Sequence, residues 1–181
     1  MRKGWKIISA TPILESEWLS VEDRTYELPN GKHGEHYYFF KKPNYVLVVA
    51  VDQNKNLIIE KNYRPGADEF IYEFPQGMIE ENENLTSTAI REVLEETGYT
   101  IYNPSVCQPI YVQASSSSLT GFVVTALFDS TKRSPRHLSH DENIEVELLS
   151  LKDIQKRVNK GLIKDMGSLA ALAIYKSLEA K

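Results

Sequence analysis

The amino-acid sequence predicts an α/β (α+β) sandwich with a mixed sheet, preceded by a small β-rich unit. Short apolar segments with the pattern of strands are interspersed with three segments of helical periodicity, which indicates helices packed on a sheet. Before them, residues 1–42 hold alternating and aromatic stretches that favour strands. We therefore expect residues 1–42 to form one unit and residues 43–181 to form the main domain.

Strands are expected in both units. In the first unit, Asn30-Gly31 lies between two alternating stretches and predicts a hairpin turn. In the main domain, apolar runs bounded by turn residues predict strands at residues 45–51, 57–60, 71–74, 107–113, 121–129 and 144–149. The polar run Ser115–Ser118 is interpreted either as a flexible loop beside the functional site or as a plain linker.

Three helices are expected. The first covers Leu85–Thr97, because Asn84 is a good N-cap and Gly98 suits the left-handed position just past the end. The second and third cover Leu151–Asn159 and Ser168–Leu178. The first helix is the one whose polar face needs a chemical explanation.

Composition and cysteine count narrow the class of protein. The 181 residues suit one domain, or one domain with a small appendage. The longest strictly apolar run, Val46–Val51, is far below the roughly 20 residues that span a bilayer, so no membrane association is expected. Because Cys107 is the only cysteine and no signal peptide is expected, the cytoplasm is the expected compartment.

Acidic residues are concentrated in one part of the chain. The formal net charge is −4, yet the window from Asp68 to Gly98 holds nine acids and one base, a charge of −8. The remaining residues therefore carry +4, which does not favour a nucleic-acid partner. An acidic island in a mildly basic chain suggests a site for cations.

The first helix carries the candidate metal ligands. At about 100° per residue, Glu92, Glu95 and Glu96 fall on one stripe. A solvated helix face is the alternative reading, but Glu92 and Glu96 repel each other, and all three lie near the helix C-terminus, where the dipole disfavours anions. Clustered carboxylate oxygens suit Mg²⁺, for which Mn²⁺ can substitute.

The segment before this helix supports the same interpretation. Gly77 permits a backbone turn that larger residues cannot make, and this turn is expected to bring the Gln76 carbonyl towards a metal. Glu83 precedes Arg91 by eight residues, so we expect these two side chains to pair and to clamp the loop to the helix.

These residues together resemble the Nudix hydrolase signature. The signature is a glycine, five residues, a glutamate, seven residues, then Arg-Glu-apolar-any-Glu-Glu-any-Gly-apolar; here it appears as Gly77, Glu83, Arg91-Glu92-Val93, Glu95-Glu96, Gly98 and Tyr99. The one departure is Tyr99, where an aliphatic residue is usual. The resemblance implies the α/β/α Nudix sandwich and hydrolysis of nucleoside diphosphates linked to a second group. It also implies that Glu92, Glu95, Glu96 and the Gln76 carbonyl bind metal.

Outside the signature, the chain is similar to the ADP-ribose pyrophosphatase and nucleoside-diphosphate-sugar branch of that family. The similarity lies in residues 62–66 and 72–75 and in the β-rich first unit, which implies a homodimer formed through that unit. ADP-ribose pyrophosphatases usually carry a Ser-Pro-Gly-like turn about 16 residues beyond the signature. Residues 114–121 read ASSSSLTG here, without the proline, which favours a broader or different range of diphosphosugars.

Other site residues follow from the expected reaction. Glu142 and Glu95 are the catalytic candidates, with Glu142 as the general base, an exposed loop acid as its alternative reading, and Glu145 as a second choice for the base. Arg64 is expected to hold substrate phosphates, unless it forms a surface ion pair with Asp68 or Glu69. Glu73 is expected to contact the nucleoside or a dimer partner.

Two other functions remain open at this point. Within enzymes, the substrate is alternatively an RNA end or a dinucleotide, although no basic patch supports RNA. The second alternative is not an enzyme: the chain could be a Nudix module that senses nucleotides without catalysis. Such a module is expected to lose metal-site carboxylates, whereas all three glutamates are present here.

Overall fold

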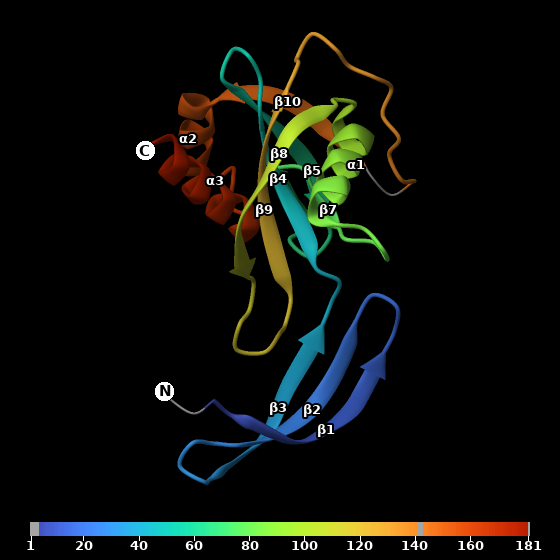
Figure 1. The fold of residues 1–181 in the computed structure, drawn as a ribbon, viewed down its shortest axis with the longest axis vertical. Coiled ribbons are helices and arrows are strands. Elements are labelled where there is room, and N and C mark those ends of the chain that lie inside the picture. The colour runs from blue at the N-terminus through green and yellow to red at the C-terminus, as the bar shows by residue number, and fades with distance from the viewer. Residues whose placement is uncertain (1–3, 141–142, 181) are drawn as a thin grey trace. The chain divides into compact units, whose positions relative to one another are not determined.

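The computed structural model describes residues 4–140 and 143–180. They form two compact units (Figure 1). The first consists of the chain up to Asn44 together with Tyr111–Thr120, and the second of Tyr45–Ile110 together with the chain from Gly121 onwards. In the part of the chain that is described, no helix is long and apolar enough to cross a membrane.

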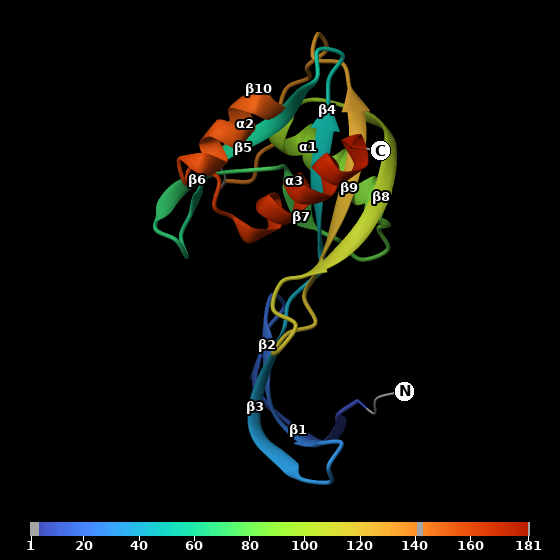
Figure 2. The same cartoon turned by 90° about the vertical axis from the view of Figure 1, so that its left-hand side faces the viewer.

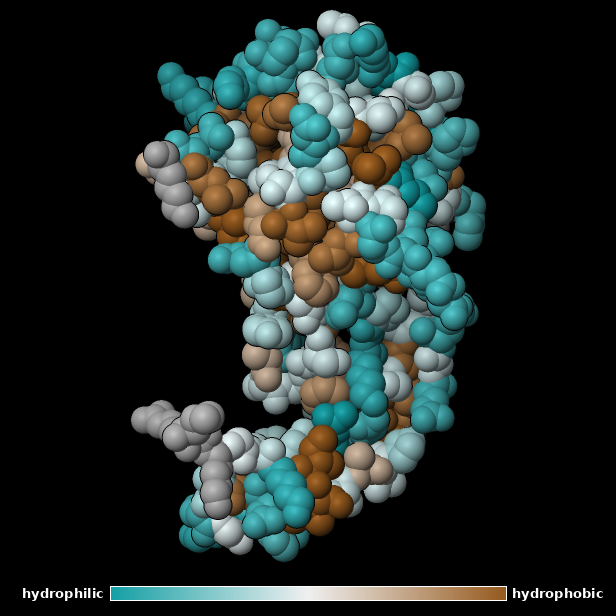
Figure 3. All heavy atoms as spheres, in the orientation of Figure 1, coloured by the Kyte–Doolittle hydropathy of each residue, from teal (hydrophilic) through white to brown (hydrophobic). Residues whose placement is uncertain are grey.

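The first unit is built on a three-stranded antiparallel sheet. Its strands are β1 (Lys6–Glu15), β2 (Ser20–Glu27) and β3 (His33–Lys41), in the order β1-β2-β3. The predicted hairpin is confirmed, with Gly31 at φ 77° between β2 and β3. All ten residues of β1 are exposed, and apolar side chains reach the surface of this unit (Figure 3). They include Trp5, Ile7, Ile13 and Trp18.

The serine run belongs to this first unit. The backbone N–H of Phe40 in β3 donates to the carbonyl of Ser116 over 2.9 Å, and Phe40 also forms a bridge with Ser117. The N–H groups of both serines donate to the carbonyl of Gln113. The run expected to be a flexible loop or a plain linker is therefore a hydrogen-bonded turn anchored on β3.

The second unit holds a mixed seven-stranded sheet. Its main order is β10-β5-β4-β9-β8, with β6 paired to β5 and β7 paired to β4. Strands β4 and β9 are parallel, whereas β4 with β7, β5 with β6 and β5 with β10 are antiparallel. The strand bounds are β4 Tyr45–Val51, β5 Asn56–Arg64, β6 Glu69–Glu73, β7 Gln76–Met78, β8 Ile101–Tyr111, β9 Thr120–Phe128 and β10 Glu145–Ser150.

Helices cover both faces of this sheet, because alternate residues of the buried strand β4 point to opposite sides. Val46, Val48 and Ala50 pack in a cluster with side chains of α1 (Leu85–Thr97). Leu47, Val49 and Val51 pack in a second cluster with side chains of α2 (Leu151–Asn159) and α3 (Met166–Glu179). Figures 1 and 2 show α1 on one side of the sheet and α2 with α3 on the other. The predicted α/β/α sandwich is confirmed.

Strand β8 and helix α3 both begin before their predicted starts. Strand β8 begins at Ile101, six residues before the predicted start, because an edge strand that carries Pro104 and Pro109 lacks the apolar run of a buried strand. Helix α3 begins at Met166, because the Asp165 side chain caps it by accepting a hydrogen bond from Ser168 N over 2.7 Å.

Candidate active site

Helix α1 begins and ends as the sequence predicts. The Asn84 side chain accepts hydrogen bonds from the N–H groups of Thr86 and Ser87, and Ser87 Oγ accepts from Asn84 N, which completes a capping box. At the other end, Gly98 adopts φ 76° and its N–H donates to the carbonyl of Leu94. These caps fix the register of the helix and therefore the direction of its glutamates.

The three glutamates of α1 form a stripe that becomes more buried towards the sheet. Glu96 is 5% exposed, the Glu92 side chain 13% and the Glu95 side chain 40%. A solvated helix face would leave all three in water. Burial of two carboxylates on one helix indicates instead that neighbouring groups hold them in place.

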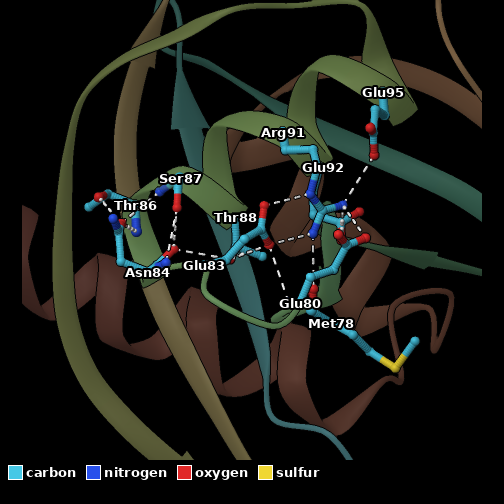
Figure 4. A network of polar contacts seen from close by, with 10 residues as sticks. All are labelled: Met78, Glu80, Glu83, Asn84, Thr86, Ser87, Thr88, Arg91, Glu92 and Glu95. Carbon is cyan, nitrogen blue, oxygen red and sulfur yellow. Dashed lines mark hydrogen bonds and ion pairs between the residues drawn. The ribbon is translucent and has the colours of Figure 1, made fainter. Parts of the chain in front are cut away.

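Arg91 connects this stripe to the preceding loop (Figure 4). Its Nε and Nη2 donate to the two carboxylate oxygens of Glu83, each over 2.8 Å. Its Nη1 donates to Glu92 over 2.8 Å and to Glu95 over 3.2 Å, and Nη2 also donates to the carbonyl of Met78 over 3.0 Å. Nε, Nη1 and Nη2 are thus all engaged by protein acceptors.

The expected clamp between Glu83 and Arg91 is confirmed. Hydrogen bonds from the Arg91 guanidinium lower the pKa of the Glu83 carboxyl to about 2, and a hydrogen bond from Thr88 adds to this effect. The same pairing raises the pKa of Arg91. This arginine is a fixed structural cation between the loop and the helix.

Gly77 is required for a reason other than the predicted turn. It lies in β7, directly opposite Val46 of β4, and it is not among the residues with positive φ. A Cβ atom at this position would lie 1.9 Å from the Glu92 carboxylate. Glycine is therefore needed because the Glu92 carboxylate lies directly against the backbone of β7, beside Gln76.

The donor chemistry of this stripe suits a hard divalent cation. Three carboxylates face one side of α1, and the Cβ-free Gly77 allows Glu92 to meet the strand that carries Gln76. Within the described residues, no group of three or more acidic, histidine or cysteine side chains is gathered closely enough to hold an ion. One oxygen each of Glu92 and Glu95 is instead directed at Arg91.

Arg64 lies in a second, separate network. Its Nε donates to Glu73 Oε2 over 3.1 Å, and its Nη2 pairs with Glu73 Oε1 over 2.7 Å. The Gln76 side-chain amide also donates to Glu73 Oε2, over 2.8 Å. The alternative surface pair is absent among these residues, because Asp68 accepts from Tyr63 and Glu69 pairs with Lys164.

Burial differs sharply across this ion pair. The Glu73 side chain is 1% exposed and that of Arg64 is 40% exposed. Burial raises the pKa of Glu73, although Arg64 pulls it back towards the ionised form. For Arg64, burial disfavours the charge, but the charges of Glu73, Glu96 and Asp165 outweigh it and raise the pKa. Arg64 is therefore a permanent cation.

Glu142 and Glu145 are the remaining candidates for the general base. Glu142 falls outside the described residues. Glu145 lies in β10, where its side chain is 64% exposed and pairs with Lys61 over 3.3 Å. These contacts do not place Glu145 against the α1 stripe.

The start of α3 supports the site in a way that the sequence did not predict. The fully buried Ser168 accepts a hydrogen bond from Phe74 N over 3.0 Å, which fixes the chain between Glu73 and Gln76. Asp165, which caps the helix, acts electrostatically on both Arg64 and Glu73. The spacing of Asp165 and Ser168, typical of a helix start, was the available signal.

The fold and these motifs define a family. A sequence model of the NUDIX domain matches residues 41–166, well over half of the chain. The chain therefore belongs to the Nudix hydrolase family, as its signature predicts. The expected enzyme class, a Nudix pyrophosphohydrolase, is confirmed with it.

Individual proteins resemble the chain over nearly its whole length. It is 30% identical to the ADP-ribose pyrophosphatase of Bacillus subtilis over 175 residues, which cover 97% of this chain and 94% of the relative. It is 25% identical to the methanol dehydrogenase activator of Bacillus methanolicus, with the same coverage of both chains. A crystal structure of an ADP compounds hydrolase superposes with a TM-score of 0.81 at 19% identity, covering 98% of this chain and 95% of that one, which supports the fold.

Proposed function

We propose that this protein hydrolyses the diphosphate bridge of nucleoside diphosphate sugars, such as ADP-ribose or GDP-mannose, with Mg²⁺ as cofactor. The products are a nucleoside monophosphate and a sugar phosphate. One observation carries the proposal: the Glu92 carboxylate of α1 lies against Gly77, and Gln76, the residue before it, shares Glu73 with the half-buried Arg64. Such a site offers oxygen ligands for a metal and a cation for phosphates. The likeness to an ADP-ribose pyrophosphatase supports the same substrate class.

Glu92, Glu95, Glu96 and the Gln76 carbonyl are the proposed metal ligands. When bound there, Mg²⁺ or Mn²⁺ neutralises phosphate charge and lowers the pKa of an attacking water. The protein supplies the orientation of the ligands through the capped α1 helix and through Arg91. It also supplies the close approach of Glu92 to β7, which Gly77 permits.

Arg64 is the proposed phosphate contact. Nε and Nη2 face Glu73, and the side chain is 40% exposed, so the rest of its planar fork is available for a phosphate oxygen. For the general base we propose Glu142, with Glu95 or Glu145 in its place if Glu142→Gln leaves turnover unchanged.

The substrate range is proposed to extend beyond ADP-ribose. The segment of residues 114–121 lacks the proline that is usual in ADP-ribose pyrophosphatases. The competing substrates are a dinucleotide such as NADH and a triphosphorylated RNA end. If the protein is instead a nucleotide sensor, it should hydrolyse none of these substrates. We propose that the enzyme works in the cytoplasm.

We also propose a homodimer formed through the first unit. The fully exposed strand β1 and several exposed aromatic side chains leave an apolar surface on this sheet that a second copy of the chain can cover. Sedimentation of the full chain tests this: a mass of twice 20.7 kDa is expected, and a monomer at micromolar concentration contradicts it.

The reaction is tested by chromatography of products from ADP-ribose, GDP-mannose, UDP-glucose, NADH, diadenosine polyphosphates and triphosphorylated RNA, with and without Mg²⁺. Metal-dependent release of nucleoside monophosphate from at least one diphosphosugar is expected. Glu96→Gln is the control, expected to lower kcat by at least about 10³-fold with an unchanged circular dichroism spectrum. Turnover of only the RNA end or dinucleotides would contradict the proposed substrate class.

A further inference from the structure

We propose that Glu73 is a positioning residue that holds two parts of the site at once: the guanidinium of Arg64 and the segment that carries Gln76. This inference rests on the proposed function, in which Arg64 binds the diphosphate and the Gln76 carbonyl binds the metal. Glu73 was expected from sequence to touch the nucleoside or a partner subunit. At 1% exposure its carboxylate is enclosed by the protein, and its mapped hydrogen bonds and ion pair go to Arg64 and Gln76.

The contact with Arg64 fixes the plane of the guanidinium. Glu73 Oε2 accepts a hydrogen bond from Nε, and Oε1 lies 2.7 Å from Nη2 as an ion pair without hydrogen-bond geometry. A two-point contact restricts rotation of the planar group, which a single hydrogen bond does not. Across the described residues, Glu73 is the sole hydrogen-bond acceptor of Arg64. The direction in which Arg64 faces a ligand is therefore set by this one carboxylate.

The contact with Gln76 reaches the other half of the site. Oε2 of Glu73 accepts from both Arg64 Nε and Gln76 Nε2, so the two donors converge on one oxygen atom. Gln76 begins β7, a strand of three residues, and Gly77 follows it directly against the Glu92 carboxylate. A change at Glu73 is thereby transmitted to the segment that lies beside the proposed metal ligands.

Charge explains why loss of Glu73 should misplace Arg64 rather than merely loosen it. Glu96 and Asp165 also act electrostatically on Arg64. With Glu73 neutral, these two carboxylates become the main attractions for the guanidinium. An arginine drawn towards Glu96 leaves the diphosphate and approaches a proposed metal ligand, which affects binding and turnover together.

A double-mutant cycle tests the link between Glu73 and Arg64. The variants are Glu73→Gln, Arg64→Gln and the double variant, with kcat and KM measured on the best diphosphosugar from the substrate panel. In the wild-type background Glu73→Gln should lower kcat/KM by about 30-fold, whereas in the Arg64→Gln background its effect should fall below about 3-fold. An equal effect in both backgrounds overturns the proposal, as does no effect in either.

A second measurement does not depend on turnover. Electron paramagnetic resonance measures Mn²⁺ binding in the absence of substrate. Glu73→Gln should weaken this binding by about 3-fold, because Gln76 is then held less firmly. Glu69→Gln is the matched control: it is a carboxylate of the same strand, paired with Lys164, and both readouts should stay at wild-type values. If Glu73→Gln binds Mn²⁺ with unchanged affinity, the proposal that Glu73 positions Gln76 is overturned.

Two other outcomes, a variant that does not fold and a wild-type protein that is inactive, can be told apart from a wrong role for Glu73. If Glu73→Gln does not fold, Glu73→Asp keeps the charge but is one methylene shorter, and it should lower kcat/KM by about 10-fold with little change in Tm; wild-type kinetics for this variant overturn the proposal. If the wild-type protein cleaves no diphosphosugar, the proposed function fails first. The Mn²⁺ titration then still decides whether Glu73 positions Gln76.

Discussion

Arg91 and Arg64 both pair with carboxylates of the candidate site, but the protein engages a larger part of the guanidinium of Arg91 than of Arg64. Arg91 directs Nε, Nη1 and Nη2 to acceptors on the loop and on α1. Arg64 is anchored along one edge by the buried Glu73 and is 40% exposed, against 23% for Arg91. An arginine saturated by protein contacts can only hold structure together. An arginine fixed along one edge is oriented and still able to bind a ligand.

The carboxylates show the same contrast. Glu83, the main partner of Arg91, has its pKa lowered to about 2, because strong hydrogen bonds favour its charge. Glu73, the partner of Arg64, has its pKa raised, because burial dominates. The first pair therefore stabilises the fold, whereas the second holds a buried charge for a positional purpose.

The largest effect is expected from disturbing the carboxylates that Arg91 holds. Gly77→Ala places a Cβ atom 1.9 Å from the Glu92 carboxylate, so this carboxylate must move away from β7. We expect kcat to fall by about 10³-fold or more, as for loss of a metal ligand. Gly66→Ala is the control, because a Cβ atom there meets no atom within 4 Å. Equal kinetics for the two variants would break the account of Glu92.

The next largest effect is a difference in the free energy of unfolding between variants of Arg91 and Arg64. Arg91→Gln leaves Glu83 without its main partner and removes the contact to Met78 O, so we expect a loss of about 3 kcal/mol in the free energy of unfolding. Urea denaturation of Arg91→Gln and Arg64→Gln gives the comparison. Arg64→Gln should cost about 1 kcal/mol, because Glu73 can take up a proton. A larger loss for Arg64→Gln would reverse the assigned roles.

Substitution of Arg64 should affect kcat/KM more than it affects stability. Arg64→Lys keeps the positive charge but loses the planar fork, so we expect kcat/KM to fall by about 10-fold to 100-fold, chiefly through KM. The Tm should remain within about 3 °C of wild type. Steady-state kinetics on ADP-ribose and thermal unfolding are the measurements. Unchanged KM would show that Arg64 does not contact the substrate.

The smallest effect concerns pH. Because the folded-state pKa of Glu83 lies below its ordinary value of 4.5, its stabilisation is present above pH 4.5 and is lost as pH falls towards 2. Glu83→Gln should therefore be less stable than wild type at pH 7, with a difference that shrinks from pH 4.5 to pH 2. Urea titrations at several pH values measure this difference. A constant difference across that range would exclude the pairing with Arg91 as its source.

The comparison also shows what the sequence could reveal. The register of α1, the pairing of Glu83 with Arg91 and the common stripe of Glu92, Glu95 and Glu96 follow from local spacing, because an α-helix has one period. The link from Arg64 to Glu73 is also close in sequence, but strand pairing and burial decide it, so Asp68 and Glu69 were equally plausible partners.

Contacts between residues far apart in the sequence could not be predicted from local sequence patterns. Ser168 meets Phe74 across 94 positions of the chain, and the edge strand β8 was only partly recognised because its prolines mask the strand signal. The need for Gly77 was predicted, but for a turn instead of the close approach of Glu92. Local periodicity predicts which residues share a face; tertiary packing decides what that face meets.

Hydrolysis of ADP-ribose in ¹⁸O-labelled water with Mg²⁺, followed by mass spectrometry of the products, tests the central claim most directly. Water attack on the diphosphate bridge predicts AMP and ribose phosphate in equal amounts, with one ¹⁸O atom in the phosphate of one of the two products and none without metal. Failure to form AMP, or release of inorganic phosphate in its place, would contradict cleavage of the bridge at this site.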